Sequence, residues 1–135
     1  MSVRVLVVED SPSMRHILVS GVKEVFPEFV VHEAEDGAFA LKMMRNSSID
    51  ILLTDINMPV MDGLKLVGMV RKDPKHKNIP IVIISTESAR KDRKGCLDLG
   101  ADAYFVKPVK MRELVTEVER LLVAAGFTNI PKVSV

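Results

Sequence analysis

Five short apolar runs, most of them rich in β-branched residues, alternate with segments of helical character along the 135-residue chain. Most of these runs lack strict alternation of apolar and polar residues, which is typical of parallel strands covered on both faces. Five successive strand–helix units predict an α/β fold, a doubly wound five-stranded parallel sheet with flanking helices. The expected strands cover residues 3–8, 29–33, 49–54, 81–85 and 103–106.

Helix signals fill the intervals between these runs. Ser11, followed by a proline, has the residue type of a helix cap. Asp36 and Gly37 predict a turn before the second helix, and Asp62 and Gly63 predict one before the third. Residues 88–99 give the weakest helical pattern, because charged residues crowd their first half. The expected helices cover residues 12–25, 38–45, 64–72, 88–99 and 111–124.

The composition is that of a single globular domain, with 47% hydrophobic and 27% charged residues. A net charge of +1 predicts neither a direct nucleic-acid partner nor attraction to a membrane surface. Cys96 is the one cysteine and cannot form an internal disulfide, which favours a reducing compartment. The first apolar run is too short for a signal peptide or a membrane-inserted span, so we expect a cytoplasmic protein.

Polar residues follow four of the five predicted strands. Glu9 and Asp10 follow the first strand, Asp55 follows the third, Ser85 ends the fourth, and Lys107 follows the fifth. Ligands of open α/β sheets bind beyond the carboxyl ends of the strands, so these side chains define the expected site. The second strand is followed by a turn and contributes nothing comparable.

Three carboxylates at one sheet edge repel one another unless a cation lies among them. Oxygen ligands without histidine or cysteine favour a hard ion such as Mg²⁺. A carboxylate next to both a metal ion and the ammonium of Lys107 is a plausible nucleophile toward phosphorus. We therefore interpret Asp55 as a reactive carboxylate, with Lys107 and the Ser85 hydroxyl placed to meet the charge on a transferred phosphoryl group.

Four motifs, in their order and spacing, resemble the receiver domains of two-component signalling, in particular CheY-like single-domain response regulators. They are VVEDS, LLTDINMPVMDG, IIST and YFVKP, and the resemblance extends over about residues 3–124. No single motif is specific, but the four together are. The resemblance implies the flavodoxin-like (CheY-like) strand order 2-1-3-4-5, with a receiver domain over residues 1–124 and a short C-terminal tail over residues 125–135.

The resemblance also implies a role for each residue that handles the phosphoryl group. Asp55 is the expected phosphoacceptor, and Lys107 is expected to bind the phosphoryl oxygens, with a cis peptide bond before Pro108. Ser85 is the expected switch hydroxyl. Tyr104 is the expected aromatic switch residue, whose ring turns inward together with that hydroxyl.

A Mg²⁺ site is implied at the same place. Asp10 and Asp55 are expected to ligate the ion directly, Asn57 through its backbone carbonyl, and Glu9 mainly through metal-bound water. Glu9 departs from the family pattern, in which aspartate is commoner at this position. Its longer side chain keeps the charge but is expected to alter the metal affinity.

By resemblance, the chain is a phosphorylation-activated switch of a two-component system. A sensor histidine kinase or a phosphorelay carrier donates the phosphoryl group, and a downstream protein docks on the fourth helix, fifth strand and fifth helix, over residues 86–124. Asn57 and Glu87 flank the path of the water that hydrolyses the acyl phosphate, and a phosphatase is a possible further partner. Because the domain catalyses only its own phosphorylation and dephosphorylation, we do not class it as a conventional enzyme.

Other functions fit the sequence less well. A haloacid-dehalogenase-like phosphatase needs a second acid two residues after Asp55, where this chain has Asn57. A DNA-binding regulator needs an output domain, and residues 126–135 are too few to form one. Chemotaxis is the commonest setting of single-domain receivers, but a phosphorelay intermediate, or a receiver fragment of a longer regulator with a separate output domain, remains an alternative.

Two further groups of charged or titratable residues have ordinary interpretations. His16, His32 and His76 lack ligand or triad spacing, so we expect them at the surface or the core boundary. The basic cluster over residues 90–94 is typical of a solvated helix face, although the resemblance places it where partners dock.

Overall fold

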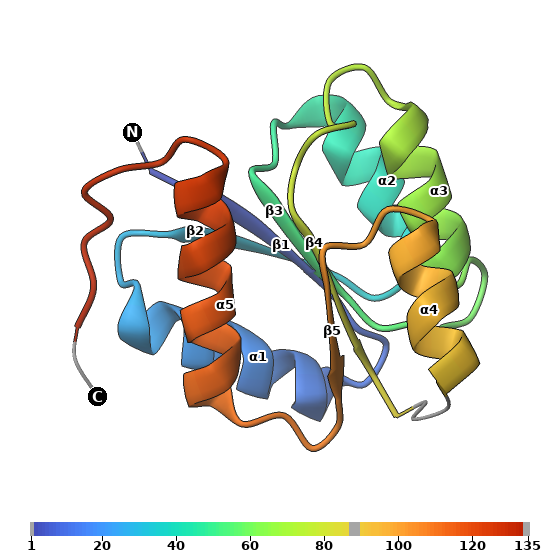
Figure 1. Ribbon diagram of the computed structural model, residues 1–135, viewed down its shortest axis with the longest axis horizontal. Coiled ribbons are helices and arrows are strands. Elements are labelled where there is room, and N and C mark those ends of the chain that lie inside the picture. The colour runs from blue at the N-terminus through green and yellow to red at the C-terminus, as the bar shows by residue number, and fades with distance from the viewer. Residues whose placement is uncertain (1, 87–89, 134–135) are drawn as a thin grey trace.

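The computed structural model describes residues 2–86 and 90–133, in which strands and helices alternate along the chain (Figure 1). None of the described helices combines the length and apolar composition that a membrane span requires. The strands are β1 (Arg4–Val8), β2 (Val30–Ala34), β3 (Ile51–Thr54), β4 (Ile81–Ser85) and β5 (Ala103–Val106). The helices are α1 (Pro12–Val25), α2 (Gly37–Asn46), α3 (Gly63–Lys72), α4 (Arg90–Asp98) and α5 (Met111–Ala124).

All five strands pair in parallel in one sheet of order β2-β1-β3-β4-β5. In the register, Val5 of β1 lies opposite Val31 of β2 and Ile51 of β3. Helices α1 and α5 cover one face of the sheet, and α2, α3 and α4 cover the other (Figure 1). The predicted fold class and strand order are confirmed.

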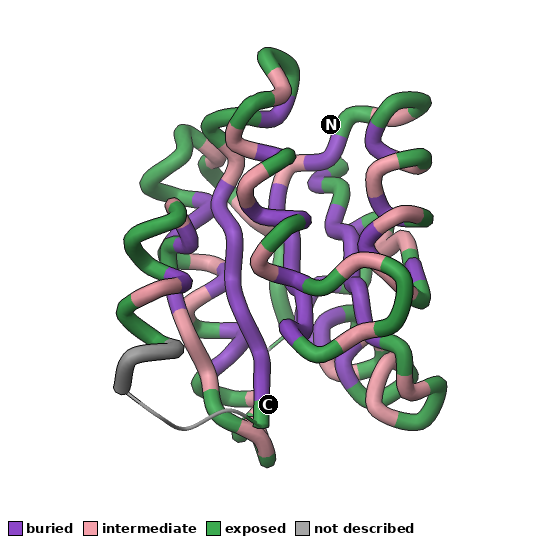
Figure 2. Tube along the Cα trace, turned by 90° about the vertical axis from the view of Figure 1, so that its right-hand side faces the viewer, coloured by how far each residue is buried: buried purple, intermediate pink, exposed green. Residues whose placement is uncertain are grey.

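Burial on both faces explains why the strand sequences are apolar throughout. In β1, Val5 and Val7 belong to the core under α1 and α5, whereas Leu6 and Val8 belong to the core under α2, α3 and α4. All four side chains are fully buried. Figure 2 shows the same contrast along the chain, with helices that alternate between buried and exposed positions.

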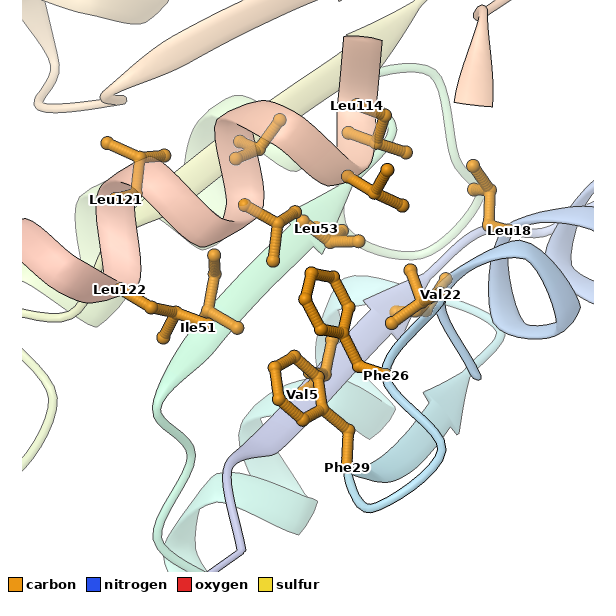
Figure 3. Packing of buried hydrophobic residues seen from close by; sticks show 14 of the residues in the cluster. Val5, Leu18, Val22, Phe26, Phe29, Ile51, Leu53, Leu114, Leu121 and Leu122 are labelled. Carbon is orange, nitrogen blue, oxygen red and sulfur yellow. The ribbon is translucent and has the colours of Figure 1, made fainter. Parts of the chain in front are cut away.

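The core between the sheet, α1 and α5 is built from branched aliphatic side chains around a pair of aromatic rings (Figure 3). The rings of Phe26 and Phe29 stack with their centroids 4.4 Å apart, at the turn between α1 and β2. Leu53 of β3 and Leu122 of α5 are completely buried in this core. This packing holds α1 and α5 on the same face of the sheet, beside the strand ends that carry the polar residues.

Three of the helices begin at side-chain caps. Ser11 was predicted as a cap, whereas Asp36 and Asp62 were predicted as turn residues, and α2 and α3 begin one residue earlier than predicted. Ser11, Asp36 and Asp62 each accept a hydrogen bond from the backbone N–H three residues later. Such caps satisfy N–H groups that have no partner inside the helix. The cap at Asp62 ends the loop that starts at Asp55.

Three strands begin later than predicted: β1 at Arg4, β2 at Val30 and β3 at Ile51. In β2 and β3 the first predicted residues have other partners. The N–H of Phe29 donates to the carbonyl of Phe26 within a turn, and β2 begins one residue further on. The N–H of Ile49 donates to Nε2 of His76 at 3.1 Å, and β3 begins at Ile51. The predicted helix over residues 88–99 is observed as α4, with residues 87–89 outside the described chain.

The expectation that His76 lies at the surface or boundary is wrong, because its side chain is 1% exposed. Nε2 accepts from Ile49, so the ring proton is assigned to Nδ1, which lies 2.8 Å from Oδ2 of Asp73. The hydrogen bond with His76 holds the pKa of Asp73 below its usual range. His76 thus joins the α3–β4 connection to the start of β3.

The C-terminal segment packs against the domain up to the last described residue. Gly126, at φ +106°, ends α5, and the side chains of Phe127 and Ile130 pack against the core under α1 and α5. The N–H of Val133 donates to the carbonyl of Val25 at 2.8 Å, and Lys132 forms an ion pair with Glu119. Residues 126–133 therefore connect the ends of α5 and α1.

Candidate functional site

Three of the predicted site residues lie one position beyond the ends of β1, β3 and β5. The backbone N–H of Glu9 donates to Ala34, that of Asp55 donates to Val8, and that of Lys107 donates to Ser85. These hydrogen bonds continue the sheet by one residue, so the backbone at each position is fixed. The three side chains consequently meet at one edge of the sheet.

The ammonium of Lys107 bridges two buried carboxylates. Its Nζ lies 2.6 Å from Oε1 of Glu9 and 3.0 Å from Oδ2 of Asp55. The side chains of Lys107, Glu9 and Asp55 are 12%, 2% and 8% exposed. The second oxygen of each acid accepts a backbone N–H, from Ser11 for Glu9 and from Ile56 for Asp55. Such charge-assisted bonds fix both carboxylates in orientation.

The pKa shifts in this cluster reflect burial and an excess of negative charge. Burial raises the pKa of Glu9 most, and this effect outweighs its hydrogen bonds with Lys107 and Ser11. Burial alone would lower the pKa of Lys107, but its hydrogen bonds with Glu9 and Asp55 prevail, and the pKa is raised. Glu9 is thus biased toward its neutral form, and Lys107 toward its charged form.

A third carboxylate makes the cluster suitable for a hard cation. Glu9, Asp10 and Asp55 each offer an oxygen, and these oxygens lie within 4.8 Å of one another. Glu9 and Asp55 are buried whereas Asp10 is exposed, so the cluster is accessible from solvent on one side. An all-oxygen set of this size fits Mg²⁺. Asn57, two residues after Asp55, lies exposed on the same loop.

The predicted switch residues lie on the two strands at the sheet edge beyond β3. Ser85, the last residue of β4, is completely buried, and Tyr104 of β5 is partly buried against the core under α2, α3 and α4. The peptide bond between Lys107 and Pro108 is cis, as the resemblance implied. Glu87, the other residue expected to flank the hydrolytic water, lies outside the described residues.

Gly63 is required by the close approach of α3 to the site. A Cβ at this position would lie 2.0 Å from the backbone oxygen of Asp55, well inside van der Waals contact. The N–H of Gly63 also donates to the carbonyl of Ile56 at 2.8 Å. The glycine that the sequence suggested as a turn residue therefore also sets the distance between α3 and the Asp55 backbone.

One residue near the site was not predicted from the sequence. Arg15 of α1 donates from Nη1 to the backbone carbonyl of Glu9 at 2.6 Å, and its Nε lies 3.1 Å from Oε1 of Glu33. Its position one turn after the Ser11 cap is the only sequence signal. Many solvated arginines of amphipathic helices have the same signal, so the sequence could not distinguish it.

Comparison with known proteins gives matches over almost the whole chain. The family model described as the response regulator receiver domain matches residues 5–119. The chemotaxis protein CheY1 of Helicobacter pylori is 39% identical over 120 residues, which cover 88% of this chain and 96% of that protein. The transcriptional regulatory protein PrrA of Mycobacterium tuberculosis is 39% identical over 127 residues, covering 94% of this chain and 53% of that protein.

Solved structures agree with these matches. The receiver domain of the sensor histidine kinase PA1611 from Pseudomonas aeruginosa was crystallised with a magnesium ion coordinated in its active site cleft. It aligns with a TM-score of 0.82 at 25% identity, covering 91% of this chain and 99% of that chain. The chain spans 53% or less of the length of several curated relatives that it matches.

Proposed function

Because the chain belongs to the response regulator receiver domain family, we propose that it is a phosphorylation-activated switch of a two-component system, with Asp55 as the phosphoacceptor. One observation carries the proposal. Lys107, Glu9 and Asp55 form a buried ion cluster at three strand ends, next to the exposed carboxylate of Asp10. A cluster used only for stability would not need a third, exposed acid that adds to the repulsion.

The proposed reaction is the transfer of a phosphoryl group from a phosphohistidine of a sensor histidine kinase. A carboxylate oxygen of Asp55 attacks the phosphorus, and the P–N bond breaks as its electron pair goes to the imidazole nitrogen. The product is an acyl phosphate on Asp55. Hydrogen bonds from the backbone N–H of Ile56 and from Lys107 orient the attacking carboxylate.

The other residues of the site act on charge and position. Lys107 meets the negative charge on the transferred oxygens, and the Ser85 hydroxyl donates a hydrogen bond to one of them. We assign the Mg²⁺ site to Asp10, Asp55 and the backbone carbonyl of Asn57, with Glu9 acting through metal-bound water. Bound Mg²⁺ would neutralise the carboxylates and polarise the phosphoryl oxygens.

The switch then follows from the attraction between the acyl phosphate and the Ser85 hydroxyl. Movement of Ser85 toward the phosphoryl group takes the end of β4 with it, and Tyr104 on the neighbouring strand turns inward. The change biases a two-state equilibrium at the surface formed by α4, β5 and α5, where a downstream protein docks. Hydrolysis of the acyl phosphate, along a water path flanked by Asn57 and Glu87 and with or without a separate phosphatase, resets the switch.

We propose chemotaxis as the first setting to test, supported by the match that covers nearly all of CheY1. The half-length match to PrrA supports the alternative, a receiver that acts within a longer regulator. A phosphorelay intermediate uses the same chemistry at Asp55. Transfer assays with cognate histidine kinases and histidine phosphotransfer proteins separate these settings.

The proposal is tested by intact-protein mass spectrometry after incubation with acetyl phosphate and Mg²⁺. We expect one phosphoryl adduct, which is lost with EDTA and in Asp55→Asn. Asp62→Asn is the matched control, because Asp62 is an aspartate of the same loop that caps α3. An adduct that persists in Asp55→Asn, or no adduct in the wild type, would overturn the assignment.

A further inference from the structure

Arg71, in the last turn of α3, has all five of its guanidinium N–H groups in reach of an acceptor. Nε and Nη2 donate to the carbonyl of Gly100 at 3.0 and 2.6 Å, and Nη2 also lies 3.0 Å from Oδ2 of Asp102. Nη1 donates to the carbonyls of Lys77 and Ile79 at 3.0 and 2.7 Å. Each of the five donors of this side chain therefore has an acceptor.

These bonds join three segments, one of which lies 29 to 31 residues from Arg71 in the sequence. They connect α3 with the α3–β4 loop and with the turn between α4 and β5. Asp102 strengthens the connection, because the same Oδ2 also accepts the N–H of Ile81 at 2.8 Å, where β4 begins. The side chain of Arg71 is 20% exposed, so these charge-assisted bonds lie partly out of solvent.

The turn is shaped to receive the guanidinium. Gly100 has a φ of +113°, and a Cβ at this position would lie 2.9 Å from Nε of Arg71. The N–H groups of this turn are also fixed, since Gly100 donates to Leu97 and Ala101 donates to Cys96. The end of α4 is therefore held by its own backbone bonds and by Arg71.

The opposite end of α4 follows β4 along the chain. β4 ends at Ser85, and α4 begins at Arg90, a few residues further along the chain. Figure 1 shows α4 running from the end of β4 to the turn that leads into β5. One end of α4 thus follows the proposed switch hydroxyl, and the other end is attached to α3.

We infer that Arg71 is the pivot of the switch. A displacement that begins at Ser85 tilts α4 about its fixed end, so the change is large near β4 and small at residues 99–102. Without Arg71, the same displacement moves the whole of α4 together with the turn at residues 99–102. The inference rests on the proposed function, because the phosphoryl group on Asp55 supplies the displacement.

The test is backbone hydrogen exchange of the full chain, with and without phosphorylation by acetyl phosphate and Mg²⁺. The variants are Arg71→Gln and Asp102→Asn, which keeps an acceptor for the N–H of Ile81. Lys72→Gln is the matched control, because Lys72 is the exposed neighbour of Arg71 in α3. Exchange at residues 99–102 is compared with exchange in β1 and β3, which reports global stability.

In the wild type we expect phosphorylation to change exchange in the first turns of α4 and to leave residues 99–102 unchanged. In Arg71→Gln we expect residues 99–102 to exchange about tenfold faster before phosphorylation and to become sensitive to it. Asp102→Asn should shift in the same direction by less, and Lys72→Gln should match the wild type.

Two results would overturn the pivot while the proposed function stands. The first is a normal Asp55 adduct with the phosphorylation response of residues 99–102 unaltered in Arg71→Gln. The second is faster exchange spread equally over β1, β3 and the turn, which would make Arg71 a general stabilising residue. A wild type that forms no adduct would instead overturn the proposed function, and the pivot with it.

Discussion

Lys107 is one ammonium that contacts two carboxylates in a cluster of three acids. Three negative charges and one positive charge leave a formal excess of two negative charges when every group is ionised. Glu9, the most deeply buried of the acids, responds with a raised pKa. The binding of a divalent cation at this cluster would therefore be linked to the ionisation of Glu9.

We expect the apparent Mg²⁺ affinity to increase with pH as Glu9 loses its proton. The raised pKa means that the fold without metal favours protonated Glu9, a contribution that is lost as pH rises through that pKa. The increase should therefore extend to pH values above the usual carboxyl range. Calorimetric Mg²⁺ titrations at these pH values measure it. Glu9→Gln should reduce the pH dependence, and equal slopes in both proteins would contradict the prediction.

The backbone conformation of Val60 has a testable effect on the stability of the fold. Its φ is 67° and its side chain is 84% exposed, in the loop between Asp55 and α3. A β-branched residue in left-handed backbone is strained, and no burial compensates for it here. We expect Val60→Asn to raise the free energy of unfolding by about 1 kcal/mol, because asparagine tolerates this conformation.

Urea unfolding in EDTA measures this difference. Val60→Thr is the matched control, since threonine is also β-branched and should leave the stability near that of the wild type. Equal unfolding midpoints for Val60→Asn and the wild type would show that the loop stores no strain at this position.

At the scale of elements, helices and strands followed from local sequence, whereas some boundaries depended on distant partners. Ser11, Asp36 and Asp62 are local caps; α1 begins where predicted, and α2 and α3 begin one residue earlier. The start of β3 was misplaced because the partner of Ile49 is His76, 27 residues away. A hydrogen bond between distant segments leaves no hydrophobic periodicity in either of them, so the sequence could not predict it.

The C-terminal segment has a predictable effect as an element. Removal of residues 127–135 deletes the contacts of Phe127 and Ile130 with the core and the bond from Val133 to Val25. We expect the free energy of unfolding to fall by about 2 kcal/mol, since both side chains are only partly buried. Urea unfolding of the full and shortened chains measures the loss, with Lys132→Ala as the control for the exposed ion pair. Unchanged stability would show that this packing contributes nothing.

At the scale of the molecule, the fold and the polar site residues were accessible from the sequence because parallel strands bring their carboxyl ends to one edge. Glu9, Asp55 and Lys107 could be placed together on that ground alone. Arg15 and Arg71 could not, because a guanidinium that binds backbone carbonyls resembles a solvated arginine in sequence. The burial of His76 was likewise set by contacts between segments.

Metal binding should stabilise the whole molecule through the same cluster. We expect Mg²⁺ at ten times its dissociation constant to raise the free energy of unfolding by about 1.4 kcal/mol. Asp10→Asn should remove most of this gain and should be more stable than the wild type in EDTA, since it lowers the repulsion. Thermal unfolding of the wild type and of Asp10→Asn, each measured with Mg²⁺ and with EDTA, gives the four stabilities to compare. If Mg²⁺ stabilised the wild type and Asp10→Asn equally, the ion would bind elsewhere.

The backbone bonds of Glu9, Asp55 and Lys107 to the adjacent strands have a consequence for folding. Neighbouring residues of a strand point to opposite faces, so a slip of one residue between β1 and β3 would turn Asp55 away from Lys107. A chain could then have its full helix and strand content and still lack the proposed phosphoacceptor site. Phosphoryl uptake during refolding would therefore report correct strand alignment, which spectroscopic measures of secondary structure do not detect.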